Sequence, residues 1–404
     1  MPLRPVAASL LLVLTFSLAP ARSSAVADKG EEALQGNCTL CHTLDRARAK
    51  HLTRSEWQQI LDRMIGFGAP IANSKKTQAL VLEYLAKTQG PLTAAASAPA
   101  PPSPAGSSTG PAARAYVVNE GSEDVWVLDV ASRKVLAKVK VGKLPHGIAL
   151  SPDGKSIYVT NQGSDSISVI DAATYATHPM GGTGRNPHAC AVSPSGRFLY
   201  VSNPSSNDVT VHDMATHSSV ATIPVGKFPH GVTMSPDGRW VYVADMDGNS
   251  ISVIDTSTNK LGVTIATAAG PHRAAISPDG KILYVVNADA NRLSLIDTEH
   301  SREIKSVPVG KAPYDIVLDS TRNVVWVANS ESDTVEALHG QTTEVLATVA
   351  VAGSPHALAL TPDGKELWVA DMAANTVAIV DIAQGKLVAT VPVGHHPHLV
   401  LIGP

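Results

Sequence analysis

The chain has 404 residues, of which 44% are hydrophobic, 4% aromatic and 17% charged, and it contains 30 Gly and 28 Pro. This length exceeds one ordinary domain, although an all-β propeller can use more than about 250 residues for a single one. The net charge of -3 and the absence of a basic run argue against a nucleic-acid partner, and three cysteines are too few for a disulfide-stapled fold.

Residues 1–27 have the pattern of a secretory signal peptide. Arg4 precedes an apolar run of about thirteen residues, shorter than the ~20 that a transmembrane helix needs, and Ala25-Val26-Ala27 follows as a cleavage site. No later segment approaches transmembrane length. We therefore expect a periplasmic protein without a membrane span in the mature chain. An uncleaved membrane anchor is the alternative.

The next segment carries a haem attachment motif. Cys38, Cys41 and His42 form C-x-x-C-H, in which both thiols can form thioethers with haem vinyl groups and the imidazole can ligate the iron. A redox disulfide or half of a zinc site uses the same cysteine spacing. The adjacent His, the export signal and the lack of a second C-x-x-C favour one covalent haem c.

Two helices are expected between residues 57 and 86, because apolar residues recur there at helical spacing. The turn at residues 66–70, rich in Gly and Pro, would aim Met64 back at the open face of the haem. A thioether ligand there raises the reduction potential, as suits electron transfer. The alternatives are that Met64 packs in the core or that His51 ligates the iron instead.

Residues 30–91 resemble a known family. The haem motif together with Trp57, Arg63-Met64, Gly68-Ala69 and residues 84–86 is similar to the small cytochrome c domains that accompany sulfite dehydrogenases and quinohaemoprotein amine dehydrogenases. The resemblance implies that Met64 is the distal haem ligand. We accordingly place a small all-α cytochrome c domain at residues 28–90.

Residues 91–114 are nearly all Pro, Ala, Ser, Gly and Thr, so a linker is expected there. A random coil of this length spans roughly 25 to 30 Å on average, and prolines extend it. The haem domain could therefore visit a site on the following domain, residues 115–404.

That following domain repeats itself at a fixed interval of 42 residues. The dipeptide Pro-His marks six of the repeats, and Pro313-Tyr314 fills the missing place. The second residues of these dipeptides are His146, His188, His230, His272, Tyr314, His356 and His398. Two other columns keep the same period: aromatic residues from Tyr116 to Trp368, and strand-ending Asn or Asp residues from Asn119 to Asp371.

Each repeat consists of short alternating runs separated by Ser-Pro-Asp-Gly and Gly-Ser turns. Strand and turn at this period predict an all-β, seven-bladed propeller with four-stranded antiparallel blades. The first repeat starts at Tyr116 without a Pro-His strand. The last Pro-His strand, at residues 397–402, is not followed by the rest of a repeat. We therefore expect this C-terminal segment to close the first blade as its innermost strand.

The motif at residues 151–161, and its counterpart at 235–245, resemble the YVTN family of propeller repeats. That family includes surface-layer proteins, the haem d1 domain of dissimilatory nitrite reductase and its relatives, and propeller subunits of amine dehydrogenases. The resemblance covers residues 115–404 and does not fix the function. It is broken at residues 319–322, which replace Ser-Pro-Asp-Gly, and in an irregular fourth strand at residues 175–182.

The innermost strand of a propeller blade lines the axial channel, so the six histidines and Tyr314 are expected to form a ring near one mouth. Three roles remain open for the ring: bonding of the neighbouring blade's backbone, binding of copper or another metal, and binding of an anionic ligand. The anionic ligand is suggested by basic residues two positions earlier in most repeats: Lys143, Arg185, Lys227, Lys311 and His395, with Ala269 and Gly353 in the other two.

Three further features could add ligands at this ring. Asp245-Met246 and Asp371-Met372 interrupt the Asn column, although Asp replaces Asn easily at turns. Cys190 could join a copper site, although a lone Cys in a strand is more often a small buried hydrophobe.

These features predict a periplasmic monohaem cytochrome whose propeller recognises a redox partner protein or a small ligand. In the alternative, the propeller is an oxidoreductase site that holds a metal or a haem d1-like cofactor and exchanges electrons with the tethered haem c. The sequence contains no H-E-x-x-H or dinucleotide motif that would name another enzyme class, and its G-x-S-x-G match at residues 106–110 lies in the expected linker rather than between a strand and a helix.

Overall fold

The structure is a computed structural model that describes residues 113–403. The chain divides into two units, residues 1–96 and 97–404, and the described residues belong to the second. The predicted signal peptide, the haem-binding residues Cys38, Cys41, His42 and Met64, and almost all of the predicted linker lie outside the described residues.

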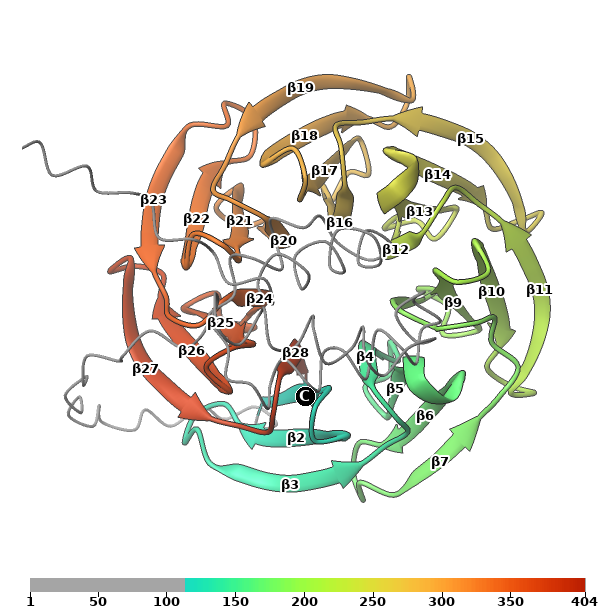
Figure 1. Cartoon of the computed structure of the whole chain (residues 1–404), viewed down its shortest axis with the longest axis horizontal. Helices are drawn as coiled ribbons and strands as arrows, with labels where there is room; N and C mark the ends of the chain where they lie inside the picture. Colours follow the sequence, from blue (N-terminus) through green and yellow to red (C-terminus); the bar gives the residue numbers. More distant parts are fainter. Residues whose placement is uncertain (1–112, 404) are drawn as a thin grey trace, which may run out of the picture. The chain divides into compact units, whose positions relative to one another are not determined.

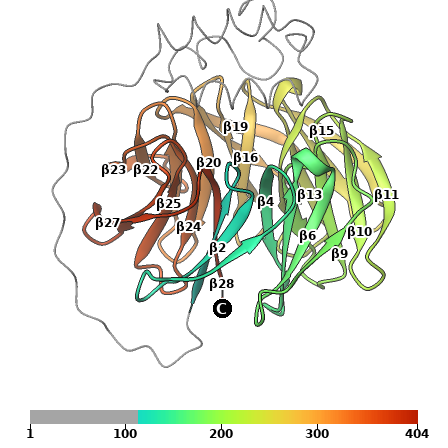
Figure 2. The ribbon, with the colours of Figure 1, turned by 60° about the horizontal axis from the view of Figure 1, so that its bottom comes forward.

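Residues 113–403 form seven antiparallel sheets of four strands each, arranged in a ring around a central axis (Figure 1). The predicted seven-bladed propeller is thereby confirmed. Each sheet is one blade, and its strands run in sequence from the axis to the outside, except in the first blade. Figure 2 shows the blades standing side by side around the axis.

The strand bounds follow the repeat closely. The first blade contains β28 (Pro397–Gly403), β1 (Arg114–Asn119), β2 (Asp124–Asp129) and β3 (Val135–Lys140). The second blade contains β4 (Pro145–Leu150), β5 (Ser156–Asn161), β6 (Ser166–Asp171) and β7 (Thr177–Met180). The third contains β8 (Cys190–Val192), β9 (Phe198–Asn203), β10 (Asp208–Asp213) and β11 (Ser218–Pro224).

The other four blades have the same plan. The fourth contains β12 (Pro229–Met234), β13 (Trp240–Asp245), β14 (Ser250–Asp255) and β15 (Lys260–Ala266); the fifth contains β16 (Pro271–Ile276), β17 (Ile282–Asn287), β18 (Arg292–Asp297) and β19 (Arg302–Pro308). The sixth contains β20 (Pro313–Asp319), β21 (Val324–Asn329), β22 (Thr334–His339) and β23 (Val345–Ala350); the seventh contains β24 (Pro355–Leu360), β25 (Glu366–Asp371), β26 (Thr376–Asp381) and β27 (Lys386–Pro392). Two short 3-10 helices, η2 (Gln162–Ser164) and η3 (Met246–Gly248), follow β5 and β13.

The ring is closed by the C-terminal strand, as the repeat frame predicts. β28 pairs antiparallel with β1, from Arg114 opposite Gly403 to Asn119 opposite Pro397. In Figure 1 the dark red β28 lies beside the cyan first blade. Because the first blade joins strands from both ends of the repeat region, β1 is paired on both sides and the ring is closed.

The core lies between neighbouring blades. Strands with alternating apolar residues bury both faces here, since each blade is covered by the next. The aromatic column on the second strand of each blade is buried throughout, from Tyr116 at 0% exposure to Trp368 at 0%. One apolar cluster joins Tyr116 of the first blade to Ile157 of the second and Trp368 of the seventh, so the closure is also packed.

The irregular fourth strand of the second blade and the altered turn at residues 319–322 were expected, whereas the short innermost strand of the third blade was not. β7 has 4 residues and β8 has 3, where the other blades have strands of 6 or 7. At the turn that lacks Ser-Pro-Asp-Gly, the Asp319 carboxylate instead accepts hydrogen bonds from the backbone N–H groups of Thr321 and Arg322, at 3.1 and 3.0 Å. Within residues 113–403, no helix is long and apolar enough to cross a bilayer.

Candidate functional site: an aromatic ring at the channel mouth

The structure brings the seven side chains of the Pro-His column together at the start of the innermost strands. Each blade contributes one side chain, and none is more than 6% exposed. The innermost strands surround the axis in Figure 1. In order around the axis, the side chains are His398, His146, His188, His230, His272, Tyr314 and His356.

These side chains form a closed circle, which we call the axial ring. Consecutive imidazole centroids are 3.5 to 3.8 Å apart. The larger ring of Tyr314 lies 4.6 Å from His272, stacked on it, and 5.0 Å from His356. The sequence predicted this assembly because one residue type recurs at the same place in every innermost strand.

The backbone before each ring residue is held by the preceding blade. The residue before the Pro adopts a left-handed conformation, with φ of 62° at Asn186 and 48° at Ala312. Its N–H donates to an Asp or Asn side chain 21 residues earlier: Asn186 N to Asp165 Oδ1 at 2.7 Å, and Ala312 N to Asn291 Oδ1 at 2.8 Å. Left-handed geometry is costly for a side chain, so this hydrogen bond fixes where the Pro-His strand begins.

The same hydrogen bond recurs at six blade junctions and was not predicted from the sequence. The acceptors are Asp165, Asn207, Asn249, Asn291, Asp333 and Asn375. The signal was available, because Asp or Asn recurs there with the 42-residue period and commonly adopts this conformation in turns.

Several ring residues also bond the next blade. The imidazole Nδ1 of His230 lies 3.1 Å from the His272 carbonyl oxygen, and Nδ1 of His356 lies 3.0 Å from that of His398. A carbonyl oxygen only accepts, so these Nδ1 atoms carry the proton and Nε2 holds the lone pair. These contacts confirm that ring histidines bond the backbone of the neighbouring blade, which was one of the three roles considered. They involve Nδ1 alone and do not define a role for Nε2.

The second blade departs from this pattern. There the hydroxyl of Thr160 donates to the His188 carbonyl oxygen, at 2.5 Å. The Nδ1 atom of His146 is buried and has no hydrogen-bond partner within residues 113–403, and the same holds for Nδ1 of His398. The axial ring therefore retains hydrogen-bonding capacity that the described residues do not use.

Burial favours the neutral form of three ring histidines. Loss of solvation holds the pKa values of His146, His230 and His398 well below their usual 6.5, and the neighbouring imidazoles lower them further. Neutral imidazoles with Nδ1 held by a backbone carbonyl resemble those that ligate metals. Within residues 113–403, however, no three His, Cys, Asp or Glu side chains are grouped as a metal site.

The basic residues before the ring are exposed, but carboxylates lie among them. Arg185 directly precedes Asn186, whose N–H donates to Asp165. Lys227 is close enough to Asp247 to lower the pKa of that carboxyl, which burial and Asp289 raise. The rim is therefore of mixed charge and not uniformly basic, because the loops beside the basic column supply carboxylates.

Most of the remaining candidate ligands are buried within the fold. Cys190 is buried, with Sγ 3.9 Å from the Tyr158 carbonyl oxygen, and burial raises the pKa of its thiol to about 12. The Asp245 carboxylate accepts from the hydroxyls of Ser250 and Ser252, at 3.1 and 2.7 Å. Asp371 is likewise buried at the end of its strand. Met246 is buried in η3, and Met372 is partly exposed.

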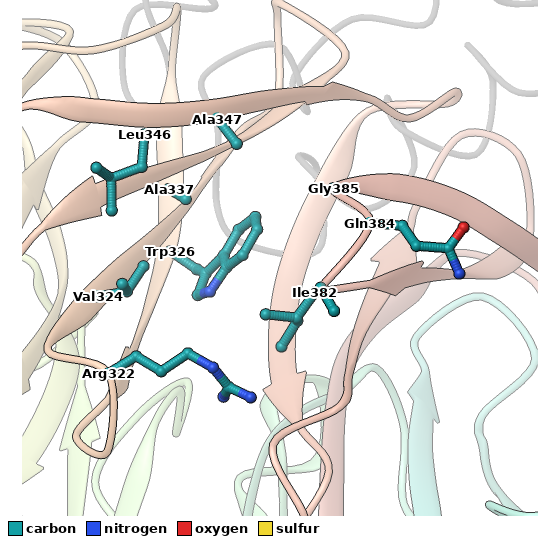
Figure 3. Close-up of a pocket in the computed structure, with 10 residues that line it drawn as sticks. Arg322, Val324, Trp326, Ala337, Leu346, Ala347, Ile382, Gln384 and Gly385 are labelled. Carbon is teal, nitrogen blue, oxygen red and sulfur yellow. The ribbon is translucent and has the colours of Figure 1, made fainter.

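A pocket of about 360 Å³ lies away from the axis, between the sixth and seventh blades. It is lined by β21, β22, β23 and the turn after β26, with Trp326, Leu346 and Ile382 on its walls (Figure 3). Arg322 is the charged side chain that lines it, and its guanidinium already bonds Asp319 Oδ2 at 2.6 Å and the Gly364 carbonyl oxygen at 3.0 Å. Apolar walls with one neutralised charge do not make this pocket a catalytic candidate.

The architecture defines the class of protein as a seven-bladed β-propeller with an aromatic ring at one end of its axial channel. Residues 131–404 match the model of the virginiamycin B lyase family, so the chain belongs to that family. No curated protein matches the chain.

Solved structures with related folds come from proteins of several kinds. Hydrazine synthase from Kuenenia stuttgartiensis is 27% identical, with a TM-score of 0.58 over 63% of this chain and 88% of that one. A dihydro-haem d1 dehydrogenase, solved in complex with DHE, is 16% identical, with a TM-score of 0.59 over 92% of this chain and 98% of that one. The periplasmic gluconolactonase of Pseudomonas aeruginosa is 18% identical, with a TM-score of 0.61 over 72% of this chain and 99% of that one.

Proposed function

We propose that this chain is a periplasmic monohaem c-type cytochrome whose propeller is a recognition domain in electron transfer. The observation that carries the proposal is the closed axial ring, found in the same chain as the motif Cys38-x-x-Cys41-His42. One segment supplies a redox centre, and the other supplies a rigid, neutral aromatic site that needs no charge to stay assembled.

The residues at the haem motif suit a haem c. Cys38 and Cys41 would bond the macrocycle, and His42 and Met64 would ligate the iron, with Met64 shielding it from water. A haem with His and Met ligands supplies reversible one-electron transfer at a raised potential. The predicted linker, residues 91–114, would raise the effective concentration of this centre near the propeller to order mM.

Two of the relatives support a redox setting. The names of hydrazine synthase and the dihydro-haem d1 dehydrogenase denote redox enzymes. The alignment with the dehydrogenase covers 92% of this chain, against 72% for the gluconolactonase. The signal peptide at residues 1–27 would place the chain in the periplasm, where a redox protein would be its partner.

The alternative is an oxidoreductase whose propeller itself holds a cofactor. It is favoured by His230 and His356, because their Nδ1 atoms are tied to backbone carbonyls and Nε2 is thereby oriented as in metal-ligating histidines. A metal such as copper, or a haem d1-like group, would take these nitrogens. His230 and His356 would orient the group, and electrons would pass between the propeller and the tethered domain.

The proposed function is tested by producing the full chain in a bacterial periplasm and recording its spectrum. We expect one covalent haem per chain, absent from a C38S/C41S variant. M64A should lower the reduction potential and open the iron to external ligands, whereas H51A, which removes the other candidate ligand, should leave the spectrum unchanged. A wild-type chain that matures without haem would contradict the proposal, and an altered spectrum in H51A alone would move the distal ligand to His51.

The alternative is tested separately with an H230A/H356A variant. If the propeller holds a metal or a second cofactor, this variant should lose it while retaining the haem c spectrum. If the ring serves recognition and packing, metal content should be unchanged and the melting temperature lower.

A further inference from the structure

One column of the repeat departs from its pattern in two adjacent blades. It is the column directly after the axial ring, which contains Gly147, Ala189, Gly231, Arg273, Asp315, Ala357 and Leu399. Five of these residues are small or apolar, as suits the close approach of neighbouring innermost strands. Arg273 on β16 and Asp315 on β20 place opposite charges just behind the ring, on either side of the step where Tyr314 replaces His.

The carboxylate of this pair is already bonded by the fold. Asp315 has 7% side-chain exposure, and its Oδ2 accepts a hydrogen bond from Leu358 N in the seventh blade at 2.8 Å. Its Oδ1 lies 3.7 Å from Nε of Arg273, which is an ion-pair distance but too long for a hydrogen bond. Asp315 thus belongs to the junction between blades.

The guanidinium of Arg273 has fewer contacts than the carboxylate of Asp315. The Arg273 side chain is 23% exposed, and it makes no hydrogen bond to any group of residues 113–403. Its ion pair with Asp315 uses one edge, and the two terminal NH₂ groups have no acceptor among residues 113–403. A guanidinium carries five donors in a fixed planar fork, so most of its hydrogen-bonding capacity is available to a ligand.

Arg273 also lies at the axis rather than on the outside. An added Cβ at Gly231 in the fourth blade would come within 3.3 Å of Arg273 Cγ, so the glycine makes room for the arginine stem. The positive charge of Arg273 lowers the pKa values of groups in three other blades: Cys190 in the third, His230 in the fourth and His398 in the first. Such a reach is expected for a cation in the channel that all the innermost strands share.

We propose that Arg273 binds a small anion, a carboxylate or oxoanion, in the axial channel directly behind the axial ring. The guanidinium fork would hold two oxygens of the anion, and the neighbouring low-dielectric walls would strengthen that contact. Asp315 pairs with the Nε edge of the guanidinium and competes with the anion for its charge. The inference rests on the proposed role of the propeller as a recognition domain, and it names the class of ligand recognised.

The test is a titration of the full-length protein with sodium acetate, and separately with sodium sulfate, at constant ionic strength, followed by saturation-transfer NMR or calorimetry. We expect saturable binding of at least one anion, weakened at least about tenfold in R273Q and partly restored in R273K, which keeps the charge but not the fork. D315N keeps an acceptor for Leu358 N and removes the competing charge, so it should bind the anion more tightly.

The matched control is R292Q, because the Arg292 guanidinium is bonded to Ser306 Oγ at 2.8 Å and is not on the axis. It should bind the anion as the wild type does. The inference is overturned if neither anion binds saturably, or if R273Q binds as well as R292Q. The haem spectrum is recorded on every sample, so a protein with haem but no anion site contradicts this inference alone, and one with an anion site but no haem contradicts only the proposed cytochrome.

Discussion

At the scale of single residues, Asp371 is a buried carboxyl group in a column otherwise dominated by asparagine. Its side chain is 1% exposed, and its Oδ1 and the nearby Thr376 Oγ1 are both buried without a hydrogen-bond partner within residues 113–403. Burial, with a contribution from Asp333, raises the pKa of Asp371 from 3.8 to about 8. In the preceding blade the equivalent Asn329 donates its amide N–H to Thr334 Oγ1 at 3.4 Å.

We therefore predict that D371N stabilises the protein, and more so at high pH. The folded-state pKa of Asp371 lies above the unfolded value, so the folded chain retains a proton that the unfolded chain loses, and stability falls as pH rises from about 4 to 8. D371N should remove this loss, with a gain of up to about 5 kcal/mol at pH 8 and little at pH 4. Urea unfolding at both pH values measures it.

D245N is the matched control for this prediction. The pKa of Asp245 is raised only to about 6, and two serine hydroxyls already donate to its carboxylate. Its gain at pH 8 should be smaller than that of D371N. Equal or lower stability of D371N at pH 8 would contradict the account of this column.

Three ring histidines, His146, His230 and His398, predict the opposite pH dependence. Their pKa values are lowered in the folded state, so the unfolded chain takes up protons below pH 6.5 that the folded ring cannot bind. Stability should be constant above pH 6.5 in this respect and fall below it, by up to about 1.4 kcal/mol per pH unit for each such histidine. The measurement is best made in a D371N background, because Asp371 acts in the other direction over this range.

In that background, H146Q should reduce the slope of stability against pH between 6 and 5 by close to one proton. H300Q serves as the control, since His300 is 61% exposed and pairs with Asp297 on the surface. The same slope in H146Q and the parent would mean that the ring is not held neutral by the fold.

At the scale of elements, the 42-residue period predicted the strands and their order, because each repeat must bury the same faces against the next. The sequence also predicted the irregular strand near residue 178, where the alternation fails. It did not predict that β8 would begin only at Cys190, after His188, since a ladder requires backbone pairing that residue types alone do not specify. The Asp and Asn hydrogen bonds between blades were not predicted, because Asp and Asn are common in turns and their residue type does not specify a partner 21 residues away.

The glycine after His146 provides a test of how tightly the innermost strands approach. A Cβ at Gly147 would overlap the carbonyl oxygen of His188 and lie 2.7 Å from Thr160 Oγ1. We predict that G147A lowers the free energy of unfolding by about 1–3 kcal/mol, because the His188 backbone cannot move aside without shifting the ring.

The control is G181A, where an added Cβ meets nothing within 4 Å. Thermal melts of the two variants should differ by several degrees. If G147A has the same melting temperature as G181A, the second and third blades are less closely packed at the channel than we describe.

The closure by β28 gives the strongest element-level prediction. Deleting residues 397–404 removes the strand that pairs with β1, the buried side chains of Leu399 and Val400, and one member of the axial ring, His398. An exposed β1 edge and an open core should abolish the cooperative unfolding transition in calorimetry. A chain shortened by Pro404 alone should melt as the full chain does, and a similar melt of the longer deletion would refute the closure.

At the scale of the whole molecule, repetition explains both what could be predicted and what could not. The seven copies fixed the architecture and assembled His146 through His398 into one ring. Function depends on the places where the copies differ, such as Arg273 and Asp315, and a single substitution in a repeat carries little signal until the structure places it at the axis. The exposed rim shows the same limit, because its carboxylates come from loops far from the basic residues in sequence.

We propose that one chain unites a single covalent haem with a propeller that recognises rather than catalyses. The most direct measurement is elemental analysis together with a haem count, on full-length protein matured in a bacterial periplasm and purified without a chelating tag. We predict one iron per chain, all of it in covalent haem, and no other metal near stoichiometry. A chain without haem iron, or one with stoichiometric copper or zinc that H230A/H356A removes, would contradict the claim.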